Sequence, residues 1–559
     1  MQKPNHMTLS QLDTSLDNQV VNNQGGSVWT VDHWEQFRRF LRLSTTVGSF
    51  YQSKIDLTKQ NAEVMVRCVV QDGEKYLNEV LVVAEQGLAV KPSTTVFALA
   101  IAAAQGSPKV KKLAMQDLEQ VCKTPTQLFE FLTYAKLLKV GWGKTVRKGV
   151  AACYAKDARL LAYHMTKYRQ RWNWTHRDVI RLAKPLRYAT GLGSDHEALY
   201  RWAVKDVAPE SFSPALRPLE GFLKAQKATT GPIWAGLVTE YDLVWEMLPT
   251  QALKLPEVWD ALLPKMPFHA LIRNIAKLTA VGLVTSGSEA EKYVVTQLNN
   301  QKLITKAKIH PVTMLLAAKA YASGRSGGYG KRINALTWVP TKLCMEAMTE
   351  TYYKAYKAVE PTNLSFYLGV DVSPSMQGTS ITPNLRACEI AGAMALAISA
   401  TEPKHHIAGF CHEMVPLSIN REMRLDEVAR NISGLSWGGT DCAQPMLDAA
   451  KKRLSIDCFV IITDNETGRS NKPPAQALRE YRVAMKKPKA SLIVIGLTAT
   501  NFTIADPTDP FMFDIAGCDQ NMMRAIQEMA LGYDRGLTSK GFLNEQLEAK
   551  EDEEEVSEE

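Results

Sequence analysis

The pattern of hydrophobic positions divides the chain near Pro361. From about residue 30 to residue 360, hydrophobic residues recur every three or four positions, as in VDHWEQFRRFLRL and KYLNEVLVVAEQ, and Gly or Pro separates these segments. This spacing is typical of amphipathic helices. Short helices that follow one another in pairs over so long a stretch predict an α-solenoid rather than one bundle.

Beyond Pro361, continuous hydrophobic runs alternate with helical segments. We expect strands at 364–371, 405–411, 457–464 and 490–497, and helices at 384–400 and 475–487. Strands that are hydrophobic on both faces are typical of a parallel sheet covered by helices on each side. The predicted fold class is therefore α followed by a doubly wound α/β domain.

The length and composition predict four regions. A chain of 559 residues is too long for one core. We expect a disordered N-terminal arm at 1–24, a helical domain at 25–362, an α/β domain at 363–543 and a disordered acidic tail at 544–559. No hydrophobic run approaches the roughly 18 residues that span a bilayer, and the N-terminus has no signal-peptide pattern. These features favour a cytoplasmic protein without a membrane partner, and the nine cysteines, with no C-x-x-C pair, favour reduced thiols.

The charge is unevenly distributed. The whole chain carries +8, but residues 544–559 contain nine acids and one lysine, so the remainder carries +16. A tail of this kind is usually a solvated end. The alternative is that it competes with nucleic acid for the basic surface of the body.

Oxygen-bearing side chains lie in three loops of the predicted α/β domain. Asp371, Ser373 and Ser375 follow the first strand, Thr440 precedes a helix, and Asp464 ends another strand. Ligands bind at the carboxyl ends of parallel strands, and these oxygens suit Mg²⁺, or Mn²⁺ as a second choice. The alternative is that the hydroxyls only cap the next helix. A phosphatase of the D-x-D type is excluded because position 373 is Ser.

These five residues resemble the metal-ion-dependent adhesion site of a von Willebrand factor A domain. The resemblance implies that Asp371, Ser373, Ser375, Thr440 and Asp464 are the metal ligands. It also implies that an acidic side chain of a protein partner completes the coordination of the ion.

A strongly basic stretch lies in the helical region. Residues 136–187 contain fourteen Lys or Arg and two acids, with Trp142, Tyr168, Trp172 and Trp174 interleaved. So many positive charges repel one another unless a polyanion neutralises them. Nucleic acid fits better than a membrane surface, because the helices lack the hydrophobic face of interfacial segments.

The basic stretch TKYRQRWNWTHRDVIRLAKP, joined to DVSPSM, GGTDCAQPM and TDNET, resembles the Ro autoantigen family of TROVE-domain proteins. The resemblance implies a ring of HEAT-like helical repeats completed by the A domain. It implies Y-type small noncoding RNA on the outer surface and single-stranded 3′ ends of misfolded RNAs in the central hole. It also implies a role in RNA quality control, with recruitment of an exoribonuclease such as polynucleotide phosphorylase.

By position, the resemblance assigns seven RNA-binding residues: Lys144, Arg147, Lys148, Lys167, Arg171, Arg181 and Lys184. Lys184 stands where the family often has His. Separately, the glycine-rich segment 322–334 carries Arg325, Lys331 and Arg332, which are expected to make flexible contacts to a strand in the hole. The alternative is that this segment is a mobile interdomain loop on the outside of the ring. We found no nucleophile–base pair, so the expected protein is a non-catalytic RNA-binding ring. The alternatives are a metal-dependent protein–protein adhesion scaffold and, third, a metal nuclease.

Overall fold

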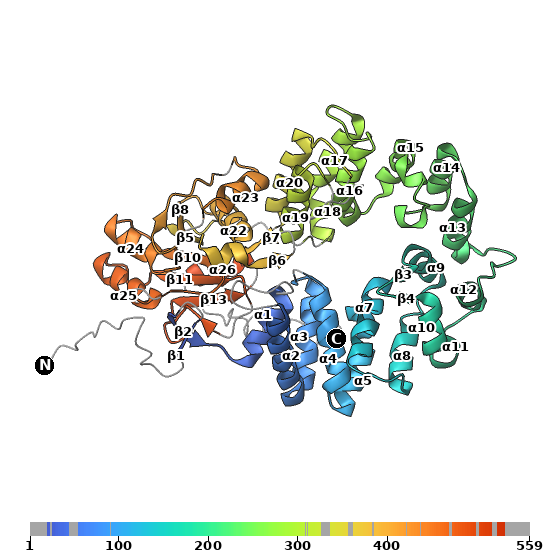
Figure 1. Cartoon of the computed structure of the whole chain (residues 1–559), viewed down its shortest axis with the longest axis horizontal. Coiled ribbons are helices and arrows are strands. Elements are labelled where there is room, and N and C mark those ends of the chain that lie inside the picture. Colours follow the sequence, from blue (N-terminus) through green and yellow to red (C-terminus); the bar gives the residue numbers. More distant parts are fainter. Residues whose placement is uncertain are drawn as a thin grey trace, which may run out of the picture.

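In the computed structural model of the chain, helices come first and a mixed α/β domain follows (Figure 1). The structure describes residues 19–22, 25–43, 54–89, 91–307, 309, 311–325, 336–355, 361–382, 385–420, 422–435, 438–468, 472–498, 502–516 and 522–531. Within this part of the chain, no helix is both long enough and hydrophobic enough to cross a membrane.

The helical region consists of short helices in a curved array, as the three-to-four-residue spacing predicted (Figure 1). Its α-helices are α1 (His33–Leu43), α2 (Lys54–Gln71), α3 (Gly73–Gln86), α4 (Ser93–Gln105), α5 (Pro108–Gln116), α6 (Leu118–Val121), α7 (Pro125–Leu137), α8 (Lys144–Ala152), α9 (Ala158–Lys167), α10 (His176–Ala183), α11 (Pro185–Tyr188), α12 (Ser194–Lys205), α13 (Arg217–Lys227), α14 (Gly231–Tyr241), α15 (Pro256–Leu262), α16 (Phe268–Ala280), α17 (Glu289–Leu298), α18 (Gln301–Ala307), α19 (Pro311–Ala322) and α20 (Lys342–Ala355). Short 3₁₀ turns are η1 (Pro214–Leu216), η2 (Trp245–Met247), η3 (Ala252–Lys254) and η4 (Leu263–Lys265), and a small hairpin joins β3 (Gln170–Arg171) to β4 (Trp174–Thr175).

The C-terminal domain is built on a six-stranded sheet. Its strands are β5 (Phe366–Asp371), β8 (His405–Phe410), β9 (Met414–Val415), β10 (Cys458–Thr463), β11 (Ser491–Gly496) and β13 (Met512–Ala516), in the spatial order β13-β11-β10-β5-β8-β9. Its helices are α21 (Pro374–Gly378), α22 (Ala387–Thr401), α23 (Leu425–Ser433), α24 (Gln444–Lys451), α25 (Pro474–Ala484) and α26 (Met522–Ala530), and β6 (Ser380–Thr382) pairs with β7 (Leu385–Arg386). All the pairings in this sheet are parallel except β8–β9. The four predicted strands and two predicted helices are confirmed.

Strand alternation divides the core of this domain into two layers. Leu368 and Val460 belong to the hydrophobic cluster that contains helix α22, whereas Tyr367 and Phe459 belong to the cluster that contains α24 and α25. Successive side chains of a strand point to opposite faces, so both faces of the sheet are buried. This explains why the strands read as continuous hydrophobic runs.

The N-terminal residues join the C-terminal domain through a separate sheet. Strand β1 (Gln19–Val21) pairs with β2 (Ser27–Thr30), and β2 pairs with β12 (Phe502–Thr503), both antiparallel. The expectation of a disordered arm over residues 1–24 is therefore wrong at its end, because backbone pairing with β2 orders residues 19–21. Residues 1–18 and the acidic tail, 544–559, lie outside the described residues.

A buried arginine of α1 fixes the same junction. The side chain of Arg39 is 1% exposed, forms an ion pair with Asp514 of β13, and approaches Glu35 with Nε 3.3 Å from Oε1. Its Nη1 also donates to the carbonyl oxygen of Phe502 at 2.9 Å. Burial lowers the pKa of Arg39, but a guanidinium stays charged at any physiological pH. The first helix is thereby held to the last part of the chain.

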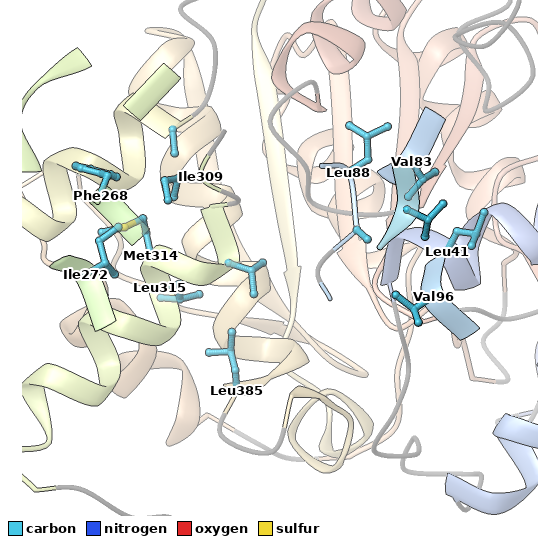
Figure 2. Packing of buried hydrophobic residues seen from close by; sticks show 14 of the residues in the cluster. Leu41, Val83, Leu88, Val96, Phe268, Ile272, Ile309, Met314, Leu315 and Leu385 are labelled. Atoms are coloured by element: carbon cyan, nitrogen blue, oxygen red, sulfur yellow. The ribbon is translucent and has the colours of Figure 1, made fainter. Parts of the chain in front are cut away.

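The other end of the helical region meets the same domain through α19. Nζ of Lys319 lies 2.5 Å from Oε1 of Glu389 at the start of α22. Figure 2 shows Phe268 and Ile272 of α16 beside Met314 of α19, in the hydrophobic cluster that also contains Leu385 of β7. Because the helices begin and end on one domain, the chain closes into a ring.

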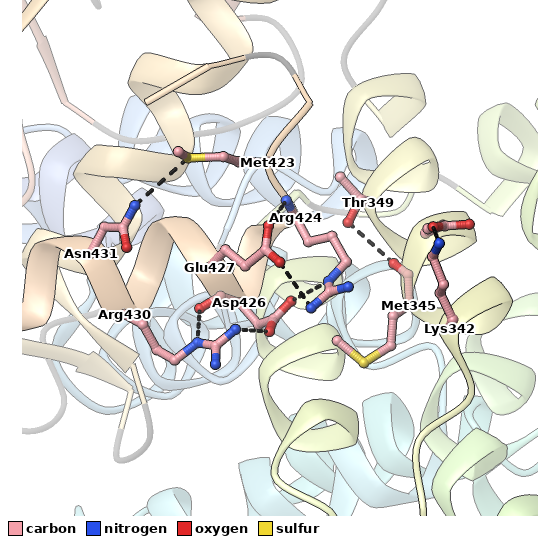
Figure 3. Close-up of polar contacts among 10 residues, drawn as sticks. Lys342, Met345, Thr349, Met423, Arg424, Asp426, Glu427, Arg430 and Asn431 are labelled. Atoms are coloured by element: carbon pink, nitrogen blue, oxygen red, sulfur yellow. Dashed lines mark hydrogen bonds and ion pairs between the residues drawn. The ribbon is translucent and has the colours of Figure 1, made fainter. Parts of the chain in front are cut away.

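Helix α23 packs on α19 and carries its own ion pairs. Arg424 precedes the helix and contacts Asp426 at 3.2 Å and Glu427 at 2.9 Å, and Arg430 contacts Asp426 at 2.8 Å. Figure 3 shows these pairs together with residues from the first half of α20. Asp426 and Glu427 lie in the first turn of α23, where negative charges interact favourably with the positive end of the helix dipole. The ion pairs and this interaction both stabilise α23 at the junction.

We expect Arg39→Met to destabilise the protein by about 3–5 kcal/mol, because it leaves the largely buried carboxylate of Asp514 without its cation and removes one of the two arginine partners of Glu35. Urea unfolding followed by circular dichroism measures the change. The control is Lys292→Met, which removes an exposed ion pair with Glu289 and should change stability by less than about 1 kcal/mol. Equal effects of the two substitutions would contradict a special role for Arg39.

Candidate functional site

The oxygen-bearing loops meet where the order of the strands reverses. Asp371 is the last residue of β5 and Asp464 directly follows β10, the strand next to it. Strand β8, which follows β5 along the chain, lies on the other side of β5. Ligands of open α/β sheets bind at such a reversal. The backbone N–H of Gly468 donates to the carbonyl oxygen of Thr440 at 2.5 Å, so the Thr440 loop lies against the loop after β10.

The two serines face one another rather than the helix backbone. The Oγ atoms of Ser373 and Ser375 are 2.9 Å apart, and the backbone N–H of Ser373 donates to Oδ1 of Asp371 at 2.9 Å. Ser373 occupies the N-cap position of α21, but its side chain makes no capping hydrogen bond. The alternative that the hydroxyls only cap the next helix is therefore not supported for Ser373.

The electrostatics of this cluster favour a cation. All five predicted ligands are buried, with at most 2% exposure. Burial raises the pKa of Asp371 to about 6, and burial together with the negative charges of Asp371 and Glu466 raises the pKa of Asp464 well above its usual range. Two carboxylates that are buried so close together repel each other until a positive charge or a proton neutralises them.

The donor set fits a divalent ion that prefers oxygen. Oδ2 of Asp464 is buried and has no hydrogen-bond partner among the described residues, so it is available to a ligand. The described residues contain no cluster of three or more His, Cys, Asp or Glu that would hold a metal, so the fit depends on the hydroxyls of Ser373, Ser375 and Thr440. Such a set suits Mg²⁺ better than zinc.

Sequence reasoning missed the residues that support these ligands. Oγ1 of Thr463 donates to Oδ2 of Asp371 at 2.6 Å and fixes the orientation of that carboxylate. Asn465 has a φ of 71° and its Nδ2 donates at 2.7 Å to the Phe502 carbonyl oxygen, which also accepts from Arg39. In the sequence, only the TDN triplet at the end of a buried strand indicates that Thr463 and Asn465 support the ligands. The triplet does not reveal that Asn465 binds the carbonyl oxygen of Phe502.

The basic stretch forms a second site on α8, α9, the β3–β4 hairpin and α10. Five of the seven predicted RNA-binding side chains are exposed there: Lys144, Lys148, Arg171, Arg181 and Lys184. None of the five has a carboxylate within ion-pair distance among the described residues. We call these five residues the cationic surface.

The other two predicted contacts are engaged inside the protein. Nε of Arg147 donates to the carbonyl oxygen of Trp142 at 2.8 Å, and its Nη1 donates to that of Leu182. Lys167 donates to Oη of Tyr163 at 3.1 Å, lies over that ring, and is 3.8 Å from a carboxylate oxygen of Glu246. Despite burial, these partners raise the pKa of Lys167, so it stays charged. Arg147 thus ties α8 to α10, and Glu246 offsets the charge of Lys167.

The predicted contacts of the ring hole are described only in part. Arg325 pairs with Thr337 in an isolated β-bridge. Oγ of Ser323 donates to the carbonyl oxygen of Arg325 at 3.0 Å. Lys331 and Arg332 lie outside the described residues.

Comparison with known proteins relates both domains to one family. The sequence model of the TROVE domain matches residues 20–213 and 239–358, and that of the Ro60 vWA domain matches residues 365–530. The chain is 35% identical to RNA-binding protein RO60 of Deinococcus radiodurans over 94% of this chain and 98% of the relative. It is 30% identical to RNA-binding protein RO60 of Caenorhabditis elegans over 93% of this chain and 91% of that relative. The chain belongs to the Ro60 family.

The crystal structure of the Deinococcus radiodurans RO (RSR) protein agrees with this assignment. It superimposes on this Ro60-family chain with a TM-score of 0.66 at 34% identity, covering 90% of this chain and all of that one. The match confirms the helical region followed by a von Willebrand factor A domain. The eight cysteines in the described part of the chain are buried and free, consistent with packing rather than disulfide roles.

We expect Arg147→Ala to destabilise this Ro60-family chain by about 1–3 kcal/mol, because two backbone carbonyls lose a charged donor. Thermal unfolding measures the change. The control is Lys148→Ala, an exposed neighbour on the same helix, which should leave stability unchanged. A stable Arg147→Ala protein with weakened RNA binding would instead place Arg147 among the direct RNA contacts.

Proposed function

We propose that the protein is a non-catalytic RNA-binding ring whose cationic surface binds small, structured noncoding RNA of the Y type. The observation that carries the proposal is the set of exposed Lys and Arg side chains of the cationic surface without carboxylate partners in the described part of the chain. Phosphate contacts from such side chains supply most of the affinity for RNA. The relatives are named RNA-binding proteins.

The two acids of the basic stretch do not neutralise this surface. Asp157 accepts hydrogen bonds from the backbone N–H groups of Arg159 and Leu160 at 3.1 Å each, as the N-cap of α9. Asp178 accepts from the backbone and the hydroxyl of Thr175 in the capping box of α10. Both carboxylates therefore serve the helix termini. The positive potential over the cationic surface is left for a polyanion.

The closed ring supports a second part of the proposal, in which single-stranded 3′ ends of misfolded RNAs enter the central opening near Arg325. An exoribonuclease that joins the complex would then degrade them in the cytoplasm. A strand passes through a narrow opening more easily than an A-form duplex. The chain itself acts as the scaffold in this scheme.

In the A domain we propose that Asp371, Ser373, Ser375, Thr440 and Asp464 hold Mg²⁺ or Mn²⁺. The ion would supply an electrophilic centre for an acidic side chain of a protein partner. The unpartnered Oδ2 of Asp464 and the raised carboxylate pKa values support this site. The site alone also supports the second candidate function, a metal-dependent adhesion scaffold without RNA.

For RNA, we expect Lys144→Glu with Lys148→Glu to weaken binding of a structured noncoding RNA and to lower the slope of log affinity against log salt by about two. Each phosphate contact releases about one counterion from the RNA, so the loss of one cation lowers the slope by about one. Filter binding across a salt series measures both quantities.

The matched control is Lys302→Glu with Lys306→Glu, which makes the same charge change on exposed positions of α18. This control should keep the slope of the unaltered protein. Equal loss in both pairs would mean that only net charge matters, and the cationic surface would not be the RNA site.

For the metal, we expect Mg²⁺ at about 100 times its dissociation constant to stabilise the protein by about 2.7 kcal/mol. Thermal unfolding of the A-domain transition with and without Mg²⁺ measures this gain. Asp371→Asn should abolish it, yet the metal-free variant should be at least as stable as the metal-free parent, because a buried charge is removed. An undiminished Mg²⁺ effect in this variant would contradict the ligand assignment.

A further inference from the structure

The turn of the β3–β4 hairpin contains one residue that does not suit its geometry. Arg171 pairs with Trp174, so the loop contains only Trp172 and Asn173, whose φ angles are 53° and 60°. Two-residue loops with positive φ at both positions favour Asn and Gly. Asn173 fits this preference, but a positive φ is rare for a residue as bulky as Trp172. Strained positions of this kind cluster at functional sites.

The environment of Trp172 differs from that of the neighbouring aromatic residues. Trp142 and Trp174 are partly buried against the hydrophobic core, with their ring centroids 6.4 Å apart. Tyr168 lies beneath the ammonium group of Lys167. The side chain of Trp172, in contrast, is 48% exposed at the tip of the hairpin. The fold holds a large hydrophobic ring in solvent at the cost of an unfavourable backbone.

Helix α7 holds this ring in place from one side. Oγ1 of Thr133 donates to the carbonyl oxygen of Trp172 at 3.4 Å, and the ring of Tyr134 lies 6.4 Å from the indole at an interplanar angle of 48°. The hairpin therefore lies beside α7 (Figure 1). A ring supported in this way loses little conformational freedom when a ligand packs on it.

The two elements that meet at Trp172 each carry a cationic residue. Arg171 precedes it in the hairpin, and Lys136 follows Thr133 by one turn on α7; both are exposed and neither has an ion-pair partner among the described residues. An exposed ring flanked by free cations matches the arrangement with which proteins bind single strands, where cations contact phosphates and aromatic rings stack on bases.

We propose that Trp172 is a stacking platform for one unpaired base of RNA bound to the cationic surface. The proposal rests on the RNA-binding function above and deepens it, since it assigns a contact to the base rather than to the phosphate. Every base has a π face, so this contact accepts many sequences. It favours RNAs with a single-stranded segment beside the phosphates that Arg171 holds.

Two probes of equal length and charge isolate the base contact: a twelve-nucleotide oligoadenylate and an abasic ribose–phosphate chain of twelve units. We expect the unaltered protein to bind the oligoadenylate about 5- to 100-fold more tightly than the abasic chain. Trp172→Asn should remove most of this difference without changing the salt slope for either probe. It should not lower the melting temperature, because Asn tolerates a positive φ.

Two further variants test the role of the ring. Trp172→Phe keeps an aromatic face and should retain most of the preference for oligoadenylate. Leu137→Asn removes an exposed hydrophobic side chain one turn beyond Thr133 and Tyr134 on α7 and should leave the preference unchanged. An unaltered preference in Trp172→Asn, or an equal loss in Leu137→Asn, overturns the stacking role while leaving RNA binding intact. Absence of salt-dependent binding of a structured noncoding RNA by the unaltered protein overturns the proposed function, and the stacking role with it. Binding of that RNA without any preference for oligoadenylate over the abasic chain overturns the stacking role alone.

Discussion

The closed architecture depends on the buried guanidinium of Arg39. It forms an ion pair with Asp514 of strand β13 and donates to the carbonyl oxygen of Phe502. Separating the first helix from the C-terminal domain would therefore leave the largely buried carboxylate of Asp514 without its cation. The same carbonyl oxygen accepts a hydrogen bond from Asn465, the residue after the candidate metal ligand Asp464. Ring closure and the geometry of the candidate metal site therefore share one acceptor.

The N-terminal hairpin strengthens this connection. Gly25 forms a β-bridge with Gly468, and a Cβ at Gly26 would lie 2.4 Å from the carbonyl oxygen of Thr467. The hairpin thus rests on the loop that carries Asp464, and only glycine permits the approach. A conformational change in that loop would therefore displace the hairpin at the junction of the ring, and a displacement of the hairpin would alter the loop.

The pattern of hydrophobic residues predicted those elements that are determined by residues close together in the sequence. The helices and the four central strands followed from periodicity, because a strand such as β10 is buried over its whole length. Strands of two to four residues, such as β2 and β12, are too short to show a period, and their pairing joins segments far apart in the sequence. Two of the three candidate ligand loops could be located from the sequence because they follow the buried strands β5 and β10. The internal engagement of Arg147 and Lys167 was not, since it depends on Leu182 and Glu246.

The pairing of β2 with β12 also imposes an order in time. Thr30 finds Phe502 only after about 470 further residues have been synthesised, which takes roughly 20–100 s at ordinary rates of translation. During this interval one edge of β2 lacks its final partner, and the guanidinium of Arg39 lacks Asp514. The nascent helical array is therefore an open arc, and its inner surface stays accessible from one side until the ring has formed.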